Sequence, residues 1–174
     1  MFNEEMFLLM GEGLLETLYM TLMAAALSYV LGLPLGVILV VTDADGVRPC
    51  APVNRVLGTI VNALRSVPFL ILLFTVIPVT RFVTGTTIGP TATIVPLTIA
   101  AAPFIARMVE GSLKEVDRGV IEASLSMGAS PLQVVWHVLL PEALPSLING
   151  AAIATTTLLG YSACLLYTSP SPRD

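Results

Sequence analysis

Residues 17–42 read TLYMTLMAAALSYVLGLPLGVILVVT and contain no charged side chain. A helix of this length, rising 1.5 Å per residue, is long enough to cross a hydrocarbon core about 30 Å thick. Over the whole chain 55% of residues are hydrophobic, 11% are charged and the mean hydropathy is +0.88. These values lie outside the soluble globular range. The sequence therefore predicts an all-α, polytopic transmembrane helix bundle.

Four apolar spans are expected in one membrane domain over residues 1–163, at about 14–41, 56–82, 88–109 and 145–163. Gly32, Pro34 and Gly36, near the end of the first span, predict a bend or a close helix contact. The N-terminus is acidic where a signal peptide has a basic region, so we expect the first span to remain as an anchor.

Basic residues predict the orientation of the spans. Arg48 and Arg55 lie between the first two spans, and Arg107, Lys114 and Arg118 follow the third. Because cytoplasmic loops carry an excess of Lys and Arg, we expect both basic segments in the cytoplasm and the N-terminus outside. The lipid bilayer is then a partner, and nothing in the acidic chain, of net charge -4, indicates nucleic-acid binding.

The polar segment at about 110–144 contains the run EASLSMGASPLQVVWHVLLP, residues 122–141. Gly128 stands where a helix ends in a left-handed residue, which glycine adopts without steric cost. Ser130, Pro131 and Gln133 have the spacing of an N-cap, a first-turn proline and a capping-box partner. The run therefore predicts two short helices joined by a tight turn.

The second helix is expected to run to about Leu140 and to be ended by prolines 141 and 145. Its predicted apolar face comprises Leu132, Val135, Trp136 and Leu139. An amphipathic hairpin that only lies in the lipid headgroups has the same pattern, so the residue pattern leaves both readings open.

The same run resembles the EAA motif of ATP-binding-cassette importer permeases, which reads EAA, three residues, Gly, nine residues, then I-x-L-P. The chain has EAS at 122–124, Gly128 and VLLP at 138–141, with Ser124 and Val138 as mild departures. The resemblance implies a permease fold with cytoplasmic coupling helices that dock on an ATPase subunit. The residues implied at that contact are Glu122, Ala123, Ser126, Met127, Gly128, Ala129, Ser130, Pro131 and Gln133.

The resemblance also implies the wider assembly. The chain itself would hold no cofactor and no ATPase site, and partner ATPase subunits would use ATP with magnesium. A second permease copy and an extracytoplasmic substrate-binding protein would complete an importer in the bacterial cytoplasmic (inner) membrane. No P-loop, nucleophile–base pair or metal-ligand spacing appears in the sequence.

Further segments are similar to the methionine-uptake branch of this family, whose members have five spans. These segments are RSVPF at 65–69, VPLT at 95–98, AAPFIAR at 101–107, PEALP at 141–145 and LGYSA at 159–163. The resemblance implies methionine as the substrate. The chain departs from this pattern after residue 163, where CLLYTSPSPRD, residues 164–174, resembles translated sequencing-adapter read-through. We expect this tail to be non-native.

Two other functions fit the residues. A membrane scaffold or sensor would recruit a partner through the same hairpin without transport, and a permease for another polar amino acid would share the motif. A secondary transporter is less favoured, because it would require ionisable residues at mid-membrane and only Arg65 comes near that position.

Arg65 and Pro68 are the candidate pathway or hinge residues within the second span. Arg65 has a structural alternative, in which its side chain reaches the cytoplasmic interface beside Asn62, and Pro68 is expected to be a kink. The charged residues around Lys114 are expected to form a solvated helix end, and the threonines at 155–157 are expected to bond their own backbone.

Overall fold

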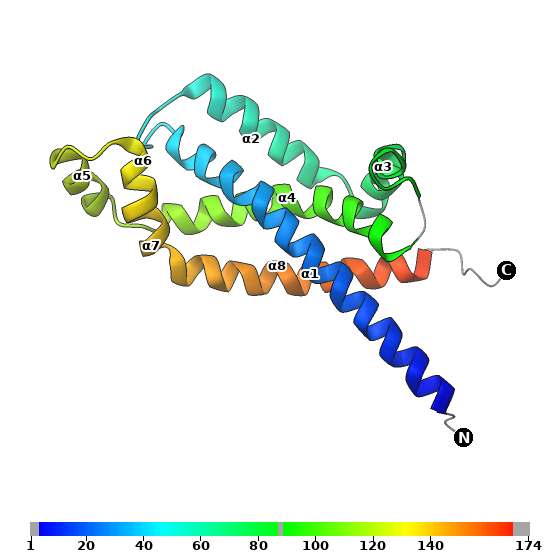
Figure 1. Ribbon diagram of the computed structural model, residues 1–174. Helices are drawn as coiled ribbons and strands as arrows, with labels where there is room; N and C mark the ends of the chain where they lie inside the picture. Colours follow the sequence, from blue (N-terminus) through cyan, green and yellow to red (C-terminus); the bar gives the residue numbers. More distant parts are fainter. Residues whose placement is uncertain (1–3, 87–88, 169–174) are drawn as a thin grey trace.

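The computed structural model describes residues 4–86 and 89–168, and all regular elements in these two ranges are helices. The longest are α1 (Glu4–Val41), α4 (Pro90–Lys114) and α8 (Leu144–Thr168). Figure 1 shows α4 and α8 side by side, with α1 crossing them obliquely. This arrangement agrees with the predicted all-α bundle.

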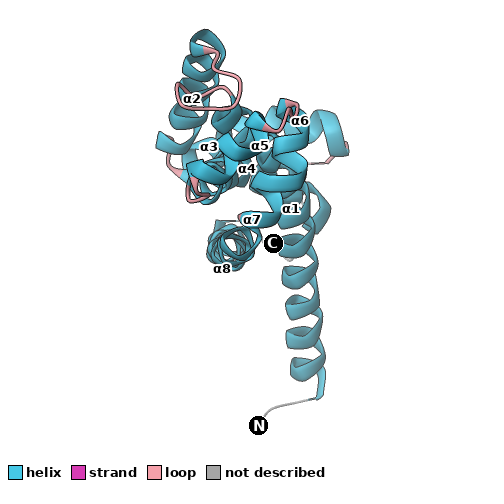
Figure 2. Cartoon of the chain, turned by 90° about the vertical axis from the view of Figure 1, so that its left-hand side faces the viewer, coloured by secondary structure: helices cyan, strands magenta, loops and turns pink. Residues whose placement is uncertain are grey.

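Helix α4 lies at the centre and contacts α1, α8 and the shorter helices α2 (Ala51–Ser66) and α3 (Phe69–Thr84). In Figure 2, α8 and α1 both lie below α4, and the two helices also contact each other. The main core cluster includes the fully buried side chains of Leu97, Ile105, Leu113, Leu139 and Leu158. A second, smaller cluster of Leu39, Val61 and Ala106 joins α1, α2 and α4.

The α1–α4 crossing is formed by small residues. A Cβ atom placed on Gly32 would lie 2.7 Å from Ile105 Cγ2, and one on Gly36 would lie 2.7 Å from the Ala106 carbonyl oxygen. Glycines four residues apart let two helix backbones approach closely in a membrane, where van der Waals packing drives association. Of the two alternatives for the end of the first span, the close helix contact is confirmed.

The predicted span at about 56–82 is not one straight helix. Helices α2 and α3 meet at a 109° bend, with Val67 extended at φ -79° and ψ 125° and Pro68 as the residue before α3. The ring of Pro68 disfavours helical dihedrals at the preceding residue, which ends α2. The predicted kink at Pro68 is confirmed, and it is a complete break.

Two of the described helical segments, Met10–Val41 and Thr91–Lys114, are long and apolar enough to cross a membrane. The bent pair α2–α3 and a second pair, bent by 68° before α8, bring the number to four if each pair counts as one span. The predicted count of four spans stays a prediction.

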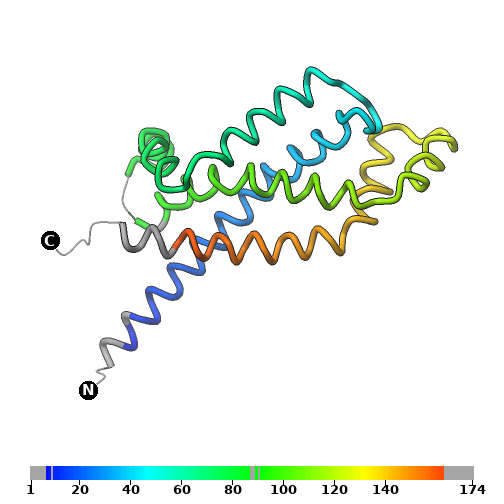
Figure 3. Tube along the Cα trace, turned by 180° about the vertical axis from the view of Figure 1, so that it is seen from behind, coloured from blue at the N-terminus to red at the C-terminus, as the bar shows by residue number. Residues whose placement is uncertain are grey.

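The two basic segments lie at one end of the bundle. Figures 1 and 3 show the loop after α1 and the short helices before α8 at the end opposite the N-terminus. Arg118 Nη2 lies 2.7 Å from Asp45 Oδ2 and joins the two segments. This placement agrees with the expectation that both face the same side.

Helix α8 continues to Thr168 and so enters the tail expected to be non-native. Residues 169–174 lie outside the described ranges. The origin of the tail stays a prediction.

Candidate functional site: the coupling hairpin

The candidate site is a pair of short antiparallel segments, called the hairpin below. It comprises α5 (Arg118–Ser126), a turn, α6 (Pro131–Val134), the π-helix η1 (Val135–Leu139) and α7 (Leu140–Glu142). Asp117 caps α5, since its carboxylate accepts the Gly119 N–H over 2.6 Å. An acidic N-cap satisfies an amide that no helical carbonyl can reach.

The turn at Gly128 has the predicted left-handed conformation, with φ +87°. The Gly128 N–H donates to the Leu125 carbonyl over 2.9 Å, and the Ala129 N–H donates to the Ser124 carbonyl over 3.1 Å. These two bonds form a Schellman motif, which closes the end of α5 and reverses the chain.

The capping box at the start of α6 is also confirmed. The Gln133 N–H donates to Ser130 Oγ over 3.4 Å, and the Ser130 N–H donates to Gln133 Oε1 over 2.8 Å. Pro131 occupies the first helical position, where a missing N–H costs nothing. The Schellman motif that ends α5 and the capping box that begins α6 thus fix the hairpin turn through local hydrogen bonds.

The prediction that Pro141 ends the second helix is wrong, because the helical path continues through it to Glu142. A π-turn precedes the proline, and the Leu140 N–H donates to the Val135 carbonyl. Pro141 has no N–H to donate and its ring would clash with the carbonyl four residues earlier. A π-turn is one way in which a helix accommodates such a residue.

The predicted apolar face of the second helix is half wrong. Val135 and Leu139 are buried as predicted, and Val134 is buried with them. Leu132 is 69% exposed and Trp136 is 62% exposed. The buried valines belong to the same core cluster as the end of α4, so this side anchors the hairpin and the other side faces outward.

The outward side carries the residues that the motif implies at an ATPase contact. Met127, at the tip, is 82% exposed. Of the nine residues named for this contact, only Ala129 is half-buried, and the rest are exposed: Glu122, Ala123, Ser126, Met127, Gly128, Ser130, Pro131 and Gln133. The hairpin thus presents a preformed surface with large apolar side chains in solvent.

Ion pairs connect the end of α4, just before the hairpin, to the loop after α1. Lys114 Nζ lies 2.7 Å from Asp43 Oδ2 and 2.9 Å from Glu110 Oε1, and Arg107 also pairs with Glu110. The hydrogen bond from Lys114, followed by that from the Ala44 N–H, holds the pKa of the Asp43 carboxyl below its ordinary value. The loop is therefore held against α4 where the hairpin begins.

The burial of Glu110 contradicts one prediction. The charged residues near Lys114 were expected to be solvated, yet Glu110 is 8% exposed. It stays buried because Arg107 and Lys114 each donate to one of its carboxylate oxygens. Asp43 and Asp45 were not predicted as site residues, since their partners lie about seventy residues further along the chain.

The remaining candidates lie away from the hairpin. Arg65 and Pro68 flank the α2–α3 break, and no hydrogen bond joins the Arg65 and Asn62 side chains within the described ranges. The three threonines at 155–157 each donate to the carbonyl four residues earlier, as predicted. His137 is exposed, and its Nδ1 lies 3.2 Å from the Gln133 carbonyl oxygen.

Comparison with known proteins agrees with this geometry. Residues 32–172 match the family described as binding-protein-dependent transport system inner membrane components, and the chain belongs to that family. It is 53% identical over 161 residues to the D-methionine transport system permease protein MetI of Escherichia coli K12, covering 92% of this chain and 74% of the relative. It is 54% identical over 148 residues to the probable MetI of Vibrio cholerae, covering 85% and 66%.

The fold of the chain is also similar to those of solved ABC transporters. The chain superposes on the inward-facing MetNI methionine ABC transporter with a TM-score of 0.91 at 52% identity, covering 93% of this chain and 75% of that chain. An amino acid ABC transporter solved with histidines superposes with a TM-score of 0.68 at 22% identity, covering 87% and 67%. The second likeness concerns the fold alone. The chain thus spans about two thirds to three quarters of the length of these relatives.

Proposed function

We propose that this chain is the membrane-spanning permease subunit of an ATP-driven methionine importer, and that the outward side of the hairpin docks on a cytoplasmic ATPase subunit. The single observation that carries the proposal is the tip of the hairpin. Met127, Leu132 and Trp136 stand exposed around a turn that a Schellman motif and a capping box hold in place. Exposed apolar side chains on a preformed element are typical of a docking surface.

The proposed assembly follows from the family. Two permease copies and two ATPase subunits would form the transporter, an extracytoplasmic binding protein would deliver the substrate, and the N-terminus would lie outside. ATP and magnesium would bind to the ATPase subunits. Closure of these subunits would move the hairpins as rigid bodies and would expose the pathway alternately to each side of the membrane. Methionine is proposed because the relatives named above carry it in their names.

The test places a charge at the hairpin tip. In membranes that also contain the ATPase subunits, we expect Met127→Glu to abolish their co-purification and to lower ATP-dependent methionine uptake about tenfold or more, since a buried unpaired charge opposes docking. Met127→Leu, the matched control, should retain both. Normal uptake by Met127→Glu at normal expression would overturn the proposal, and docking without any uptake by the parent chain would favour a scaffold.

A further inference from the structure

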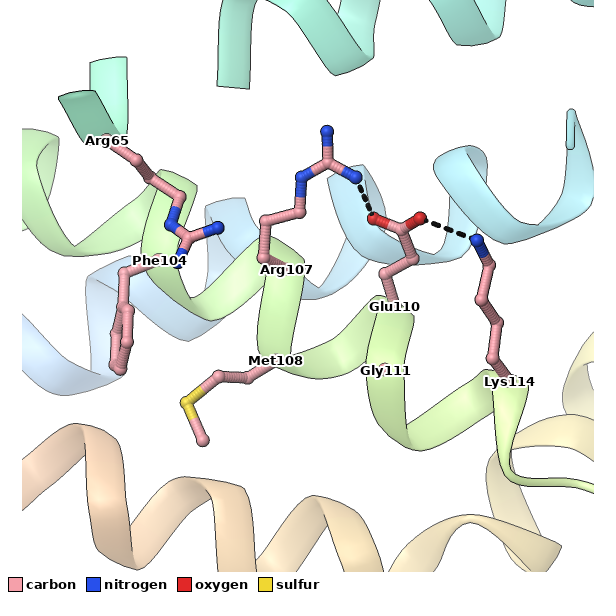
Figure 4. A pocket seen from close by; sticks show the side chains of 7 residues that line it. All are labelled: Arg65, Phe104, Arg107, Met108, Glu110, Gly111 and Lys114. Atoms are coloured by element: carbon pink, nitrogen blue, oxygen red, sulfur yellow. Dashed lines mark hydrogen bonds and ion pairs between the residues drawn. The ribbon is translucent and has the colours of Figure 1, made fainter. Parts of the chain in front are cut away.

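A second candidate site lies at the surface of the bundle, between the end of α2, where the Arg65 side chain is exposed, and the C-terminal half of α4. It is an open pocket of about 390 Å³. Figure 4 shows Arg65 reaching toward it from α2, while its other lining residues come from α4. The α4 residues run from Phe104 to Lys114 and so extend over about 15 Å of helix.

The pocket has an excess of positive charge. Its lining includes Arg65, Arg107 and Lys114, and the one carboxylate among the lining residues is Glu110. Glu110 already accepts hydrogen bonds from Arg107 and from Lys114. Arg65 makes no ion pair or hydrogen bond to any residue within the described ranges. One guanidinium therefore faces the pocket without an internal counter-charge.

Arg107 adds a second polar group. Its Nη2 donates to the Gly58 carbonyl of α2 over 3.0 Å, which ties the two helices together. Its Nε atom is buried and has no hydrogen-bond partner among the described residues. Buried polar atoms are almost always satisfied, so Arg107 Nε and the Arg65 guanidinium are donors of the pocket lining that lack an acceptor within the described part of the chain.

The neighbouring wall is apolar. Phe104 and Met108 are half-buried and line the same pocket, and Figure 4 shows their side chains directed away from that of Arg107. Gly111 leaves the pocket open, since a Cβ atom there would meet nothing within 4 Å. A ligand that fits these surfaces combines an anionic oxygen group with an apolar body.

We propose that this pocket binds an amphipathic ligand that carries an anionic oxygen group, with its carboxylate or phosphate oxygens accepting hydrogen bonds from Arg65 and its apolar part in contact with Phe104 and Met108. Glu110 is occupied by two cations, so the anionic group is the part of the ligand that the pocket recognises. The choice of an apolar amino acid as probe rests on the proposed function, but the site does not depend on the hairpin.

The experiment measures equilibrium binding of radiolabelled L-methionine to the chain in nanodiscs of phosphatidylcholine. We expect binding that methioninamide, which lacks the carboxylate, fails to displace. Arg65→Gln should weaken it about tenfold or more, because charge-assisted hydrogen bonds are strong, and Arg65→Lys should weaken it less. Arg48→Gln, in the exposed loop after α1, is the matched control and should leave affinity unchanged.

A second arm identifies the source of the anionic group. In nanodiscs that contain phosphatidylglycerol, native mass spectrometry would reveal a retained lipid that Arg65→Gln releases if the group is a lipid phosphate. Phe104→Ala provides a variant that keeps every charge, and it should weaken whichever ligand binds. Absence of both L-methionine binding and Arg65-dependent lipid retention would overturn the inference. ATPase co-purification is read separately, so failure at the hairpin and failure at the pocket are distinguishable.

Discussion

The α1–α4 crossing and the hairpin use apolar residues in opposite ways. At the crossing, Gly32 and Gly36 bring two backbones together and leave no space for a further carbon atom. At the hairpin, Met127 and Trp136 project into solvent although the backbone beneath them is fixed by hydrogen bonds. The first region is stabilised by its packing. The second takes its shape from local bonds and leaves its large side chains free for contact.

The largest expected effect tests the crossing. Gly36→Ala should destabilise the chain by about 3 kcal/mol, since its Cβ would lie 2.7 Å from the Ala106 carbonyl oxygen and from Val109. Thermal unfolding followed by circular dichroism in one detergent measures this. The matched control is Gly160→Ala, where a Cβ meets nothing within 4 Å and helix propensity should add up to about 1 kcal/mol. Equal melting temperatures for the two variants would contradict close packing at the crossing.

The second effect is confined to the hairpin. Gly128→Val should cost about 2 kcal/mol, because φ +87° is strained for any residue with a Cβ and most of all for a β-branched one. We expect the backbone amides at positions 128 and 129 to exchange hydrogen for deuterium about tenfold faster or more than in the parent chain. The exchange rates of the α4 amides should not change. Gly128→Asn, which tolerates the left-handed conformation, is the control. Equal protection in both variants would show that the turn does not depend on this residue.

The smallest effect concerns the ion pair between the loop after α1 and the end of α4. Asp43→Asn keeps an acceptor for the Ala44 N–H but removes the charge paired with Lys114, and should cost less than about 1 kcal/mol. Because the pKa of Asp43 is lowered in the folded state, its contribution is complete above the ordinary value of 3.8 and is lost as the pH falls through the lower folded value. Parent and variant should therefore differ at neutral pH and converge below about pH 3.8. A constant difference down to pH 2 would contradict the assignment.

Local signals in the sequence predicted the hairpin turn well. Gly128, Ser130 and Gln133 act through bonds to residues at most four positions away, so their spacing alone carries the information. The buried face of the following helix was not predictable in the same way. Nearly every residue from 132 to 140 is apolar, and periodicity does not tell which side meets α4. Tertiary contacts bury Val134 and leave Leu132 exposed.

Longer-range features depended on the fold. Pro68 predicted a kink, but its sequence neighbourhood does not determine a 109° bend. The pairs of Asp43 with Lys114 and of Asp45 with Arg118 join residues whose proximity exists only after α1 and α4 pack together. The pocket that includes Arg65 likewise required α2 to lie along α4.

Only one residue, Ala143, separates the hairpin from α8, so a rotation of the hairpin about this residue would also rotate α8. Ala143, at the 68° bend, is buried, so α7 and α8 meet at a packed joint that lacks a free linker. Up to residue 163, before the tail expected to be non-native, helix α8 has 20 residues and is therefore about 30 Å long at 1.5 Å per residue. If the hairpin and α8 turn as one body about this joint, a rotation of about 5° displaces the far end of α8 by about 3 Å, roughly the width of a small side chain.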